Sequence, residues 1–191
     1  MSSVARLREA AGAELLRRVN AWRWQACLPW VEGRLLDVGC GSNDLVRNYR
    51  LAGGIGLGTD FTAWAGVDAV ADAPALPFGS STFGTVSLLA CLNHIAEREA
   101  CLAECHRVLV PQGRLLVTMI DPVVGVLIHG AIGHADEAQH RHVAHGERPG
   151  LWPREMQALL AGAGFQLNRR VRFELGLNVI YVASSSNSRS A

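Results

Sequence analysis

The chain has 191 residues, a formal net charge of +1, and 49% hydrophobic residues. This length suits one domain with one core, and the near-neutral charge gives no electrostatic reason to expect nucleic acid as a partner. No apolar run reaches the ~18–20 residues that a membrane span needs, and no long apolar stretch follows Arg6 and Arg8 to indicate a secretory signal. We therefore expect a cytoplasmic protein without stable membrane insertion.

The basic residues and the cysteines limit which reactions and which cellular compartment the sequence allows. All 18 basic residues are Arg, which excludes Schiff-base chemistry and a phosphate-binding P-loop lysine. The five cysteines form no C-x-x-C pair, and several stand in apolar runs; they are Cys27, Cys40, Cys91, Cys101 and Cys105. This odd number fits a reducing compartment better than a disulfide scaffold.

Apolar periodicity predicts the elements in chain order. Helical spacing marks residues 3–19 and 21–30, and we interpret residues 1–30 as a helical cover on the domain rather than an interfacial helix for a lipid-like substrate. Strands are predicted over 34–38, 54–59, 67–71, 82–90 and 114–120, a helix over 98–109, and a turn at 111–113. This alternation predicts parallel βαβ units in a doubly wound α/β sheet with helices on both faces.

The pattern breaks over residues 121–150 and then resumes. A helix is predicted over 153–163, with Gly164 just past its end, and strands over 165–173 and 177–183. The single domain would thus span residues 1–183. Residues 184–191 are mostly Ser with Asn and Arg, a composition that predicts a disordered tail.

The first strand leads into a glycine-rich turn, Asp37-Val38-Gly39-Cys40-Gly41-Ser42-Asn43. Such a turn lets a ligand approach the backbone closely. A dinucleotide-binding turn would carry a third glycine where Asp44 stands, and an acidic side chain there would repel a pyrophosphate at the helix N-terminus. The turn therefore suits a ligand without phosphates, which disfavours an NAD-type oxidoreductase.

Further motifs follow in order. Asp60 ends the second strand, 19 residues after Gly41, where a carboxylate can accept hydrogen bonds from both ribose hydroxyls, although a helix-capping role is the alternative. Residues 71–78 read Ala-Asp-Ala-Pro-Ala-Leu-Pro-Phe. Residues 83–86 read Phe-Gly-Thr-Val, and residues 107–115 read Arg-Val-Leu-Val-Pro-Gln-Gly-Arg-Leu.

Over residues 30–120 this set resembles the class I S-adenosylmethionine-dependent methyltransferases of the type 11 group. Their motifs are D/E-x-G-x-G, often followed by a third glycine, D-A-x-x-L-P-F, F-D-x-V and R-V-L-K-P-G-G-x-L. In this chain Asn43 replaces the third glycine, Gly84 replaces Asp and Gln112 replaces Gly. The resemblance implies S-adenosylmethionine as the cofactor. It also implies a seven-stranded Rossmann-like sheet of order 3-2-1-4-5-7-6 with the last strand antiparallel.

The resemblance carries cofactor roles onto matching positions. The turn would wrap the methionine part, with Asp37 beneath the amino group; Asp60 would hold the ribose, and Asp72 the adenine amino group, with the backbone of Ala73 near the ring. The cofactor-binding residues implied are Asp37, Gly39, Cys40, Gly41, Asn43, Asp60, Phe61, Asp72, Ala73 and Cys91.

Asn93 and His94 follow the fourth strand, at the sheet edge where ligands bind in open α/β folds. We expect both beside the transferred methyl group, with His94 as a candidate base because an ordinary imidazole changes charge near neutral pH. Orientation of cofactor or substrate, or capping of the next helix, are the alternative roles of His94.

Five of the seven histidines fall between residues 129 and 145. By the resemblance, residues 121–150 are a substrate lid, and a solvated loop is the alternative. The spacing of the five histidines matches no strong zinc signature, so we predict no metal site. We interpret Cys101, Cys105 and His106 as core and surface residues of a helix rather than ligands.

These observations predict an enzyme that transfers a methyl group from S-adenosylmethionine to a small-molecule acceptor by in-line displacement. The alternative is a non-catalytic S-adenosylmethionine-binding module that serves as a sensor or a partner subunit. The sequence leaves the acceptor atom and the oligomeric state open.

Overall fold

The computed structural model describes residues 18, 20–122, 124 and 150–186. A helix over residues 20–27 runs into a short 3-10 helix, η1 (Leu28–Trp30). The strands are β1 (Leu35–Val38), β2 (Gly56–Asp60), β3 (Ala69–Val70), β4 (Phe83–Leu89), β5 (Leu109–Ile120), β6 (Phe165–Phe173) and β7 (Asn178–Ser185). The remaining helices are α2 (Asp44–Leu51), η2 (Leu92–His94), α3 (Arg98–Val108), α5 (Pro153–Gly162) and η3 (Glu174–Gly176).

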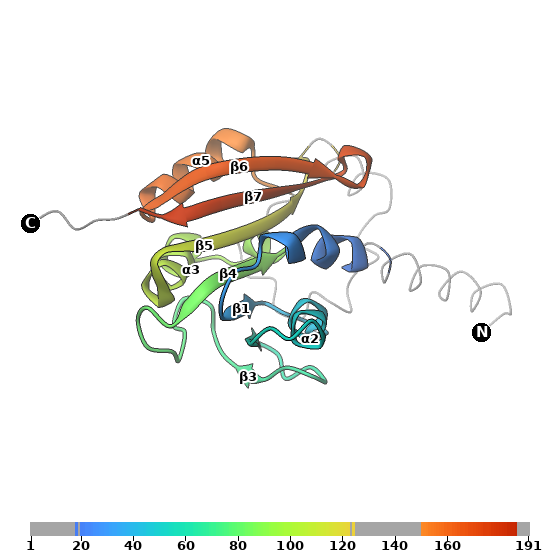
Figure 1. Ribbon diagram of the computed structural model, residues 1–191. Coiled ribbons are helices and arrows are strands. Elements are labelled where there is room, and N and C mark those ends of the chain that lie inside the picture. The colour runs from blue at the N-terminus through green and yellow to red at the C-terminus, as the bar shows by residue number, and fades with distance from the viewer. Residues whose placement is uncertain (1–17, 19, 123, 125–149, 187–191) are drawn as a thin grey trace, which may run out of the picture.

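The seven strands form one sheet of order β3-β2-β1-β4-β5-β7-β6 (Figure 1). The pairs from β3 to β5 are parallel, whereas β7 runs antiparallel to both β5 and β6. The predicted sheet order and the antiparallel last strand are therefore confirmed. The carboxyl ends of β1, β2, β4 and β5 meet at one edge, which we call the carboxyl edge.

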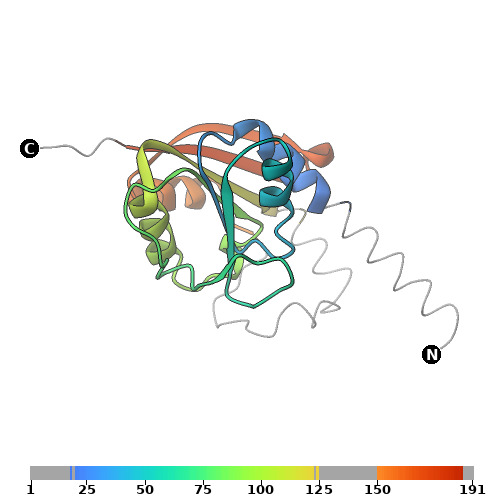
Figure 2. The ribbon, with the colours of Figure 1, turned by 60° about the horizontal axis from the view of Figure 1, so that its bottom comes forward.

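Helices cover both faces of the sheet, as predicted (Figures 1 and 2). On one face, α3 and α5 pack over a core that includes Val86, Leu102 and Met156. On the other face, the helix over residues 20–27 and α2 pack over a smaller cluster that includes Cys27 and Leu45. All four residues of β1 are buried because this central strand is covered on both faces.

Two predicted boundaries differ from the structure. The turn expected at residues 111–113 lies within β5, where the register against β4 shifts between the pairs Phe83–Leu109 and Thr85–Arg114. Gln112 there has φ 63°, so it adopts the left-handed conformation that glycine takes without strain. At the other end, β7 runs to Ser185, beyond the predicted end of the last strand. The helix predicted over residues 3–19 lies almost wholly outside the described residues.

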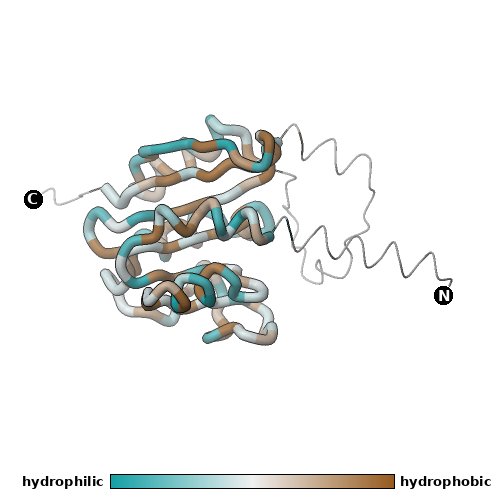
Figure 3. The backbone as a smooth tube through the Cα atoms, turned by 45° about the vertical axis from the view of Figure 1, so that its right-hand side comes forward, coloured by the Kyte–Doolittle hydropathy of each residue, from teal (hydrophilic) through white to brown (hydrophobic). Residues whose placement is uncertain are grey.

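The outer strand β6 is polar, in contrast to the centre of the sheet. Figure 3 shows it as mostly hydrophilic, and Asn168, Arg169, Arg170 and Arg172 are exposed along it. Charged side chains on an edge strand disfavour pairing with another sheet. The turn that joins β6 to β7 lies at the carboxyl edge, because the Asp121 N–H at the end of β5 donates to the Leu177 carbonyl at 2.8 Å.

Candidate active site

The glycine-rich turn is bonded to the end of β2. The N–H groups of Gly39 and Cys40 both donate to the Thr59 carbonyl, at 2.8 and 2.9 Å. Gly39 and Gly41 have φ values of 71° and 51°, which a residue with a side chain adopts only with strain. A side chain on Gly41 would meet no atom within 4 Å, so open space lies beside the turn. The turn therefore exposes its backbone on that side.

Asp60 is held between two loops. Its Oδ2 accepts the Gly41 N–H and its Oδ1 accepts the Thr62 N–H, both at 2.9 Å. Its backbone carbonyl accepts the Ala71 N–H at 3.0 Å, which links it to the end of β3. Each carboxylate oxygen keeps further lone-pair capacity, so Asp60 is oriented to accept two more hydrogen bonds.

Asp37 is a buried carboxyl group beneath the turn, only 2% exposed. Burial raises its pKa to about 7; the hydrogen bond from Ser87 opposes this rise and the charge of Asp60 adds to it. The Ser87 hydroxyl donates to Asp37 Oδ1 at 2.6 Å. A cation placed beside Asp37 would favour its ionised form.

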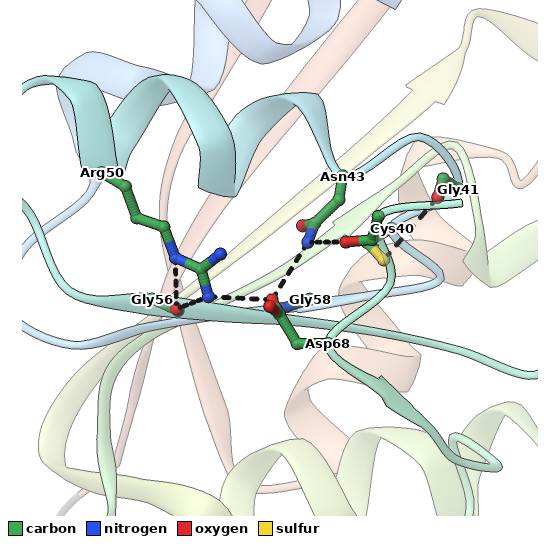
Figure 4. A network of polar contacts seen from close by, with 8 residues as sticks. Cys40, Gly41, Asn43, Arg50, Gly56, Gly58 and Asp68 are labelled. Atoms are coloured by element: carbon green, nitrogen blue, oxygen red, sulfur yellow. Dashed lines mark hydrogen bonds and ion pairs between the residues drawn. The ribbon is translucent and has the colours of Figure 1, made fainter. Parts of the chain in front are cut away.

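Asn43 closes the turn through a network centred on Asp68 (Figure 4). The Asn43 amide donates to Asp68 Oδ2 at 3.0 Å and to the Gly66 carbonyl at 2.8 Å. The same Asp68 oxygen accepts the Gly58 N–H and the Arg50 guanidinium. Burial opposes the charge of Asp68, but these hydrogen bonds lower its pKa below the usual value. The network fixes the start of α2 against β2.

Cys40 and Cys91 lie at the turn as protonated thiols. A side chain on Gly39 would come within 2.2 Å of the Cys91 sulfur, so Cys91 packs directly against the turn. Burial raises the pKa of both thiols, and for Cys40 the charges of Asp37, Asp60 and Asp68 add to the effect. The electrostatic environment of the turn is therefore negative, which suits a cationic ligand.

The two residues expected at the adenine follow β3. Asp72 is exposed and Ala73 is half-buried, and both come directly after Ala71, whose N–H is bonded to Asp60. Phe61, next to Asp60, is 60% exposed. The structure thus brings these three residues to the same part of the carboxyl edge as the turn, with their polar and aromatic groups open to a ligand.

Asn93 and His94 stand together in η2, after β4. The Asn93 side-chain nitrogen lies 3.0 Å from His94 Nε2. Arg98, the first residue of α3, donates to the carbonyls of Leu92 and Asn93 at 3.1 and 3.0 Å. Arg98 therefore anchors the backbone that presents the candidate base.

Three supporting residues were missed by the sequence analysis: Ser87, Asp68 and Arg98. Each contacts a predicted residue from a distant or separate element, and none belongs to a motif that marks its role. Arg98 could have been noticed in the sequence, because the helix dipole disfavours a cation at the first position of a helix and such a placement therefore suggests a specific contact.

Other predictions concern parts that the structure describes incompletely. The lid over residues 121–150 and its five histidines lie almost wholly outside the described residues. Within the described ranges, no group of three or more His, Cys, Asp or Glu side chains could hold a metal ion. In the same ranges, no helix is long and apolar enough to cross a membrane. Cys101 and Cys105 are buried in the core, and the His106 ring packs edge-on against Phe165.

The residues present fit S-adenosylmethionine. The open space beside Gly41 can admit the methionine chain, and a buried carboxyl group lies below it for an ammonium. Asp60 is oriented for two hydroxyl groups on neighbouring ribose carbons. The negative surroundings favour a ligand with a sulfonium and an ammonium, and they disfavour a pyrophosphate.

Gly58→Ala should lower the free energy of unfolding by ~1–3 kcal/mol, because its new methyl group would lie 2.0 Å from Asn43 Oδ1. Urea denaturation measures the change. In the background of Asn43→Gly, which removes the clash and tolerates the φ of 58°, the same substitution should cost less than ~1 kcal/mol. Strictly additive effects of the two substitutions would contradict this contact.

Asp37→Asn should change how stability depends on pH. The folded-state pKa of about 7 lies above the unfolded value, so the folded protein binds the extra proton and wild-type stability falls as pH rises from about 4 to 7. The variant lacks this loss and should gain on the order of 2–4 kcal/mol relative to wild type at pH 8. Asp44→Asn, which changes a partly exposed acid on α2, is the control and should behave as wild type between pH 5 and 8. An Asp37→Asn profile parallel to wild type would show that Asp37 stays ionised.

Known proteins are similar to this chain in sequence. A family model described as a methyltransferase domain matches residues 36–117. The chain is 28% identical over 202 residues to demethylmenaquinone methyltransferase of Thermus thermophilus, covering 84% of this chain and 88% of that protein. It is 29% identical to the ubiquinone/menaquinone biosynthesis C-methyltransferase UbiE of Desulfotalea psychrophila, covering 75% of this chain and 70% of that protein.

Solved structures with a similar fold also include a methyltransferase. A crystal structure of an S-adenosylmethionine-dependent methyltransferase from Thermotoga maritima, a possible histamine N-methyltransferase, matches with a TM-score of 0.71. It is 17% identical, and the match covers 94% of this chain and 97% of that one, so it shows a shared fold. The family model, the curated relatives and the sheet order agree with the resemblance to the class I S-adenosylmethionine-dependent methyltransferases of the type 11 group.

Proposed function

We propose that the protein transfers the methyl group of S-adenosylmethionine to a small-molecule acceptor, with the acceptor activated at Asn93 and His94. The observation that carries this proposal is the geometry at the carboxyl edge, where open space beside Gly41 lies next to the buried Asp37 and to Asp60, which the Gly41 N–H orients. Such a site attracts a sulfonium cation. After transfer the sulfur is neutral, so the same charges hold the product less strongly and favour its release.

In this proposal each part of the site holds one part of the cofactor. Asp37 and the backbone from Gly39 to Gly41 bind the methionine end, and Asp60 accepts hydrogen bonds from the ribose hydroxyls. Asp72 accepts from the adenine amino group, while Ala73, Phe61 and Cys91 line the space around it. Asn43 contributes to cofactor binding indirectly. Its amide donates hydrogen bonds to the Gly66 carbonyl and to Asp68, so its role is to hold the turn in place.

Bound S-adenosylmethionine supplies a methyl group already activated by the sulfonium. The acceptor then needs alignment and, for an O–H or acidic C–H nucleophile, a base. His94, 3.0 Å from the Asn93 side-chain nitrogen, would take the proton of the acceptor as the acceptor is methylated. Arg98 keeps the backbone of η2 in place through both carbonyls.

The names of the two curated relatives suggest where to look for the acceptor. One is named a demethylmenaquinone methyltransferase, and the other a ubiquinone/menaquinone biosynthesis C-methyltransferase. A reduced quinone ring has hydroxyl groups that a neutral imidazole can deprotonate, which makes the neighbouring ring carbon nucleophilic. We therefore propose a hydroxylated aromatic ring as the acceptor class. The test is transfer of a labelled methyl group from S-adenosylmethionine to a panel of such rings, with a short-chain demethylmenaquinol included.

Asp60→Ala should weaken S-adenosylmethionine binding by ~1–3 kcal/mol, the range expected when a pair of charge-assisted hydrogen bonds is lost. Isothermal titration calorimetry measures the affinity. Asp44→Ala removes an acid of α2 that pairs with Arg47 and should bind as wild type does. Unchanged affinity in Asp60→Ala, or preferential binding of NAD by the wild type, would contradict the assignment.

His94→Ala should lower kcat by the ~10²–10⁴ that accompanies loss of a general base, while cofactor affinity stays nearly constant. His94→Gln can still form hydrogen bonds but cannot act as a base, so it should be as slow as His94→Ala. A raised KM with nearly intact kcat, or rescue by His94→Gln, would instead assign a positioning role. Cofactor binding without methyl transfer in wild type would favour the non-catalytic module.

A further inference from the structure

The turn between β6 and β7 carries a fully exposed leucine. Leu175, the central residue of η3, has 103% relative exposure. Glu174 and Leu175 have φ values of 52° and 55°, followed by Gly176 at 89°. Three successive residues thus adopt the left-handed conformation, and two of them carry side chains (Figure 1, upper right).

Burial of the Leu175 side chain does not offset the conformational strain of this backbone. A bulky residue at positive φ is an outlier that costs on the order of 1–3 kcal/mol, whereas glycine adopts it freely. Leu175 gains no packing within the described residues, since its whole side chain faces solvent. The conformation therefore presents an apolar side chain outward at the tip of the hairpin.

Two further apolar side chains are exposed at the same end of β5. Leu177, 42% exposed, accepts the Asp121 N–H through its carbonyl. Trp152, 54% exposed, follows Gly150, which lies against the Ile120 carbonyl and Pro122. We call Trp152, Leu175 and Leu177 the apolar tip. It lies on the carboxyl edge, where β4 also ends and η2 follows.

Positive charge runs along the strand behind this tip. Arg172, Arg170 and Arg169 are exposed on β6, and at about 3.3 Å per residue Arg172 stands roughly 10 Å behind Leu175. The one acid of the hairpin, Glu174, turns inward: its side chain is half-buried, it accepts a hydrogen bond from Asn178, and Arg23 lies near it. The hairpin surface therefore combines an apolar tip with a basic strand.

We propose that the apolar tip and the basic strand β6 dock this protein on the surface of an anionic lipid bilayer. Trp152, Leu175 and Leu177 enter the interfacial region, and Arg169 and Arg170 contact lipid phosphates. Arg172 is ion-paired with Asp121 at 3.2 Å and supports the hairpin instead. A tip with aromatic and leucine side chains beside arginines is the pattern of interfacial binding, in which apolar area and headgroup charge add. The carboxyl edge then faces the membrane, so an acceptor carried in the lipid reaches the site directly.

A lipid surface fits better than a protein partner or a second copy. A stable protein interface buries at least ~1,000 Å² with matched shape, whereas three exposed side chains offer little area. Two copies paired through β6 would bring like charges together. Lipid needs no complementary shape and supplies the negative charge.

The test measures binding to vesicles without methyl transfer, so this inference and the proposed function can fail separately. The wild-type protein is sedimented with vesicles of phosphatidylcholine alone or with an equal part of phosphatidylglycerol, at low and high salt. It should bind the phosphatidylglycerol vesicles more tightly, and less so at high salt. Leu175→Asp should bind about tenfold more weakly, and Arg169→Gln with Arg170→Gln should lose about fivefold per charge.

The matched control is Leu51→Asp. Leu51 is 81% exposed at the end of α2, on the opposite edge of the sheet, so this change should leave vesicle binding as in wild type. Leu175→Asp should melt as wild type does and should methylate a water-soluble acceptor equally well. Absence of wild-type binding, equal loss in Leu51→Asp and Leu175→Asp, or insensitivity to both phosphatidylglycerol and the Arg substitutions would overturn the proposal. So would a change in oligomeric mass in Leu175→Asp with vesicle binding intact, because the tip would then join copies of the chain.

Discussion

The bond between the glycine-rich turn and the end of β2 is the constraint on which the site depends. Two consecutive N–H groups, from Gly39 and Cys40, share the Thr59 carbonyl, and the next free N–H, from Gly41, is taken by Asp60. These contacts force the turn into left-handed conformations and bring the carboxylate of β2 beside the end of β1. If these hydrogen bonds were lost, Asp60 would no longer be oriented and the backbone beside the open space at Gly41 would no longer be held in place.

The same arrangement concentrates negative charge that the fold must stabilise. Asp68 is stabilised by three donors, whereas Asp37 has Ser87 and is otherwise desolvated, which is why the pKa shifts of these two carboxyl groups have opposite signs. A positively charged ligand beside Asp37 would lower the cost of ionising this buried carboxyl group.

The carboxyl edge also organises the parts that face the acceptor. Arg98 holds η2 from the first turn of α3, and the hairpin of β6 and β7 closes over the end of β5 through Leu177. The antiparallel insertion of β7 between β5 and β6 is what brings the hairpin tip to this edge. A purely parallel arrangement would send the connection away to the opposite edge. The topology thus places the loop that holds Asn93 and His94 and an exposed apolar turn at the same edge of the sheet.

The sequence by itself determined the βα alternation, the sheet order through its resemblance to a family, and the positions of Asp37, Asp60 and the loop holding Asn93 and His94. It could do so because apolar periodicity and glycine-rich turns are local signals, and strand ends at one edge follow from parallel topology. Only the tertiary structure decided that the Asn43 amide donates a hydrogen bond to Asp68 instead of facing open space, and that the Ser87 hydroxyl donates one to Asp37. It alone also showed that Gln112 lies within a strand and that Leu175 stands exposed. These facts depend on contacts between residues 25 to 50 positions apart, or on backbone angles that neighbouring strands impose, and neither is written in the local pattern of the chain.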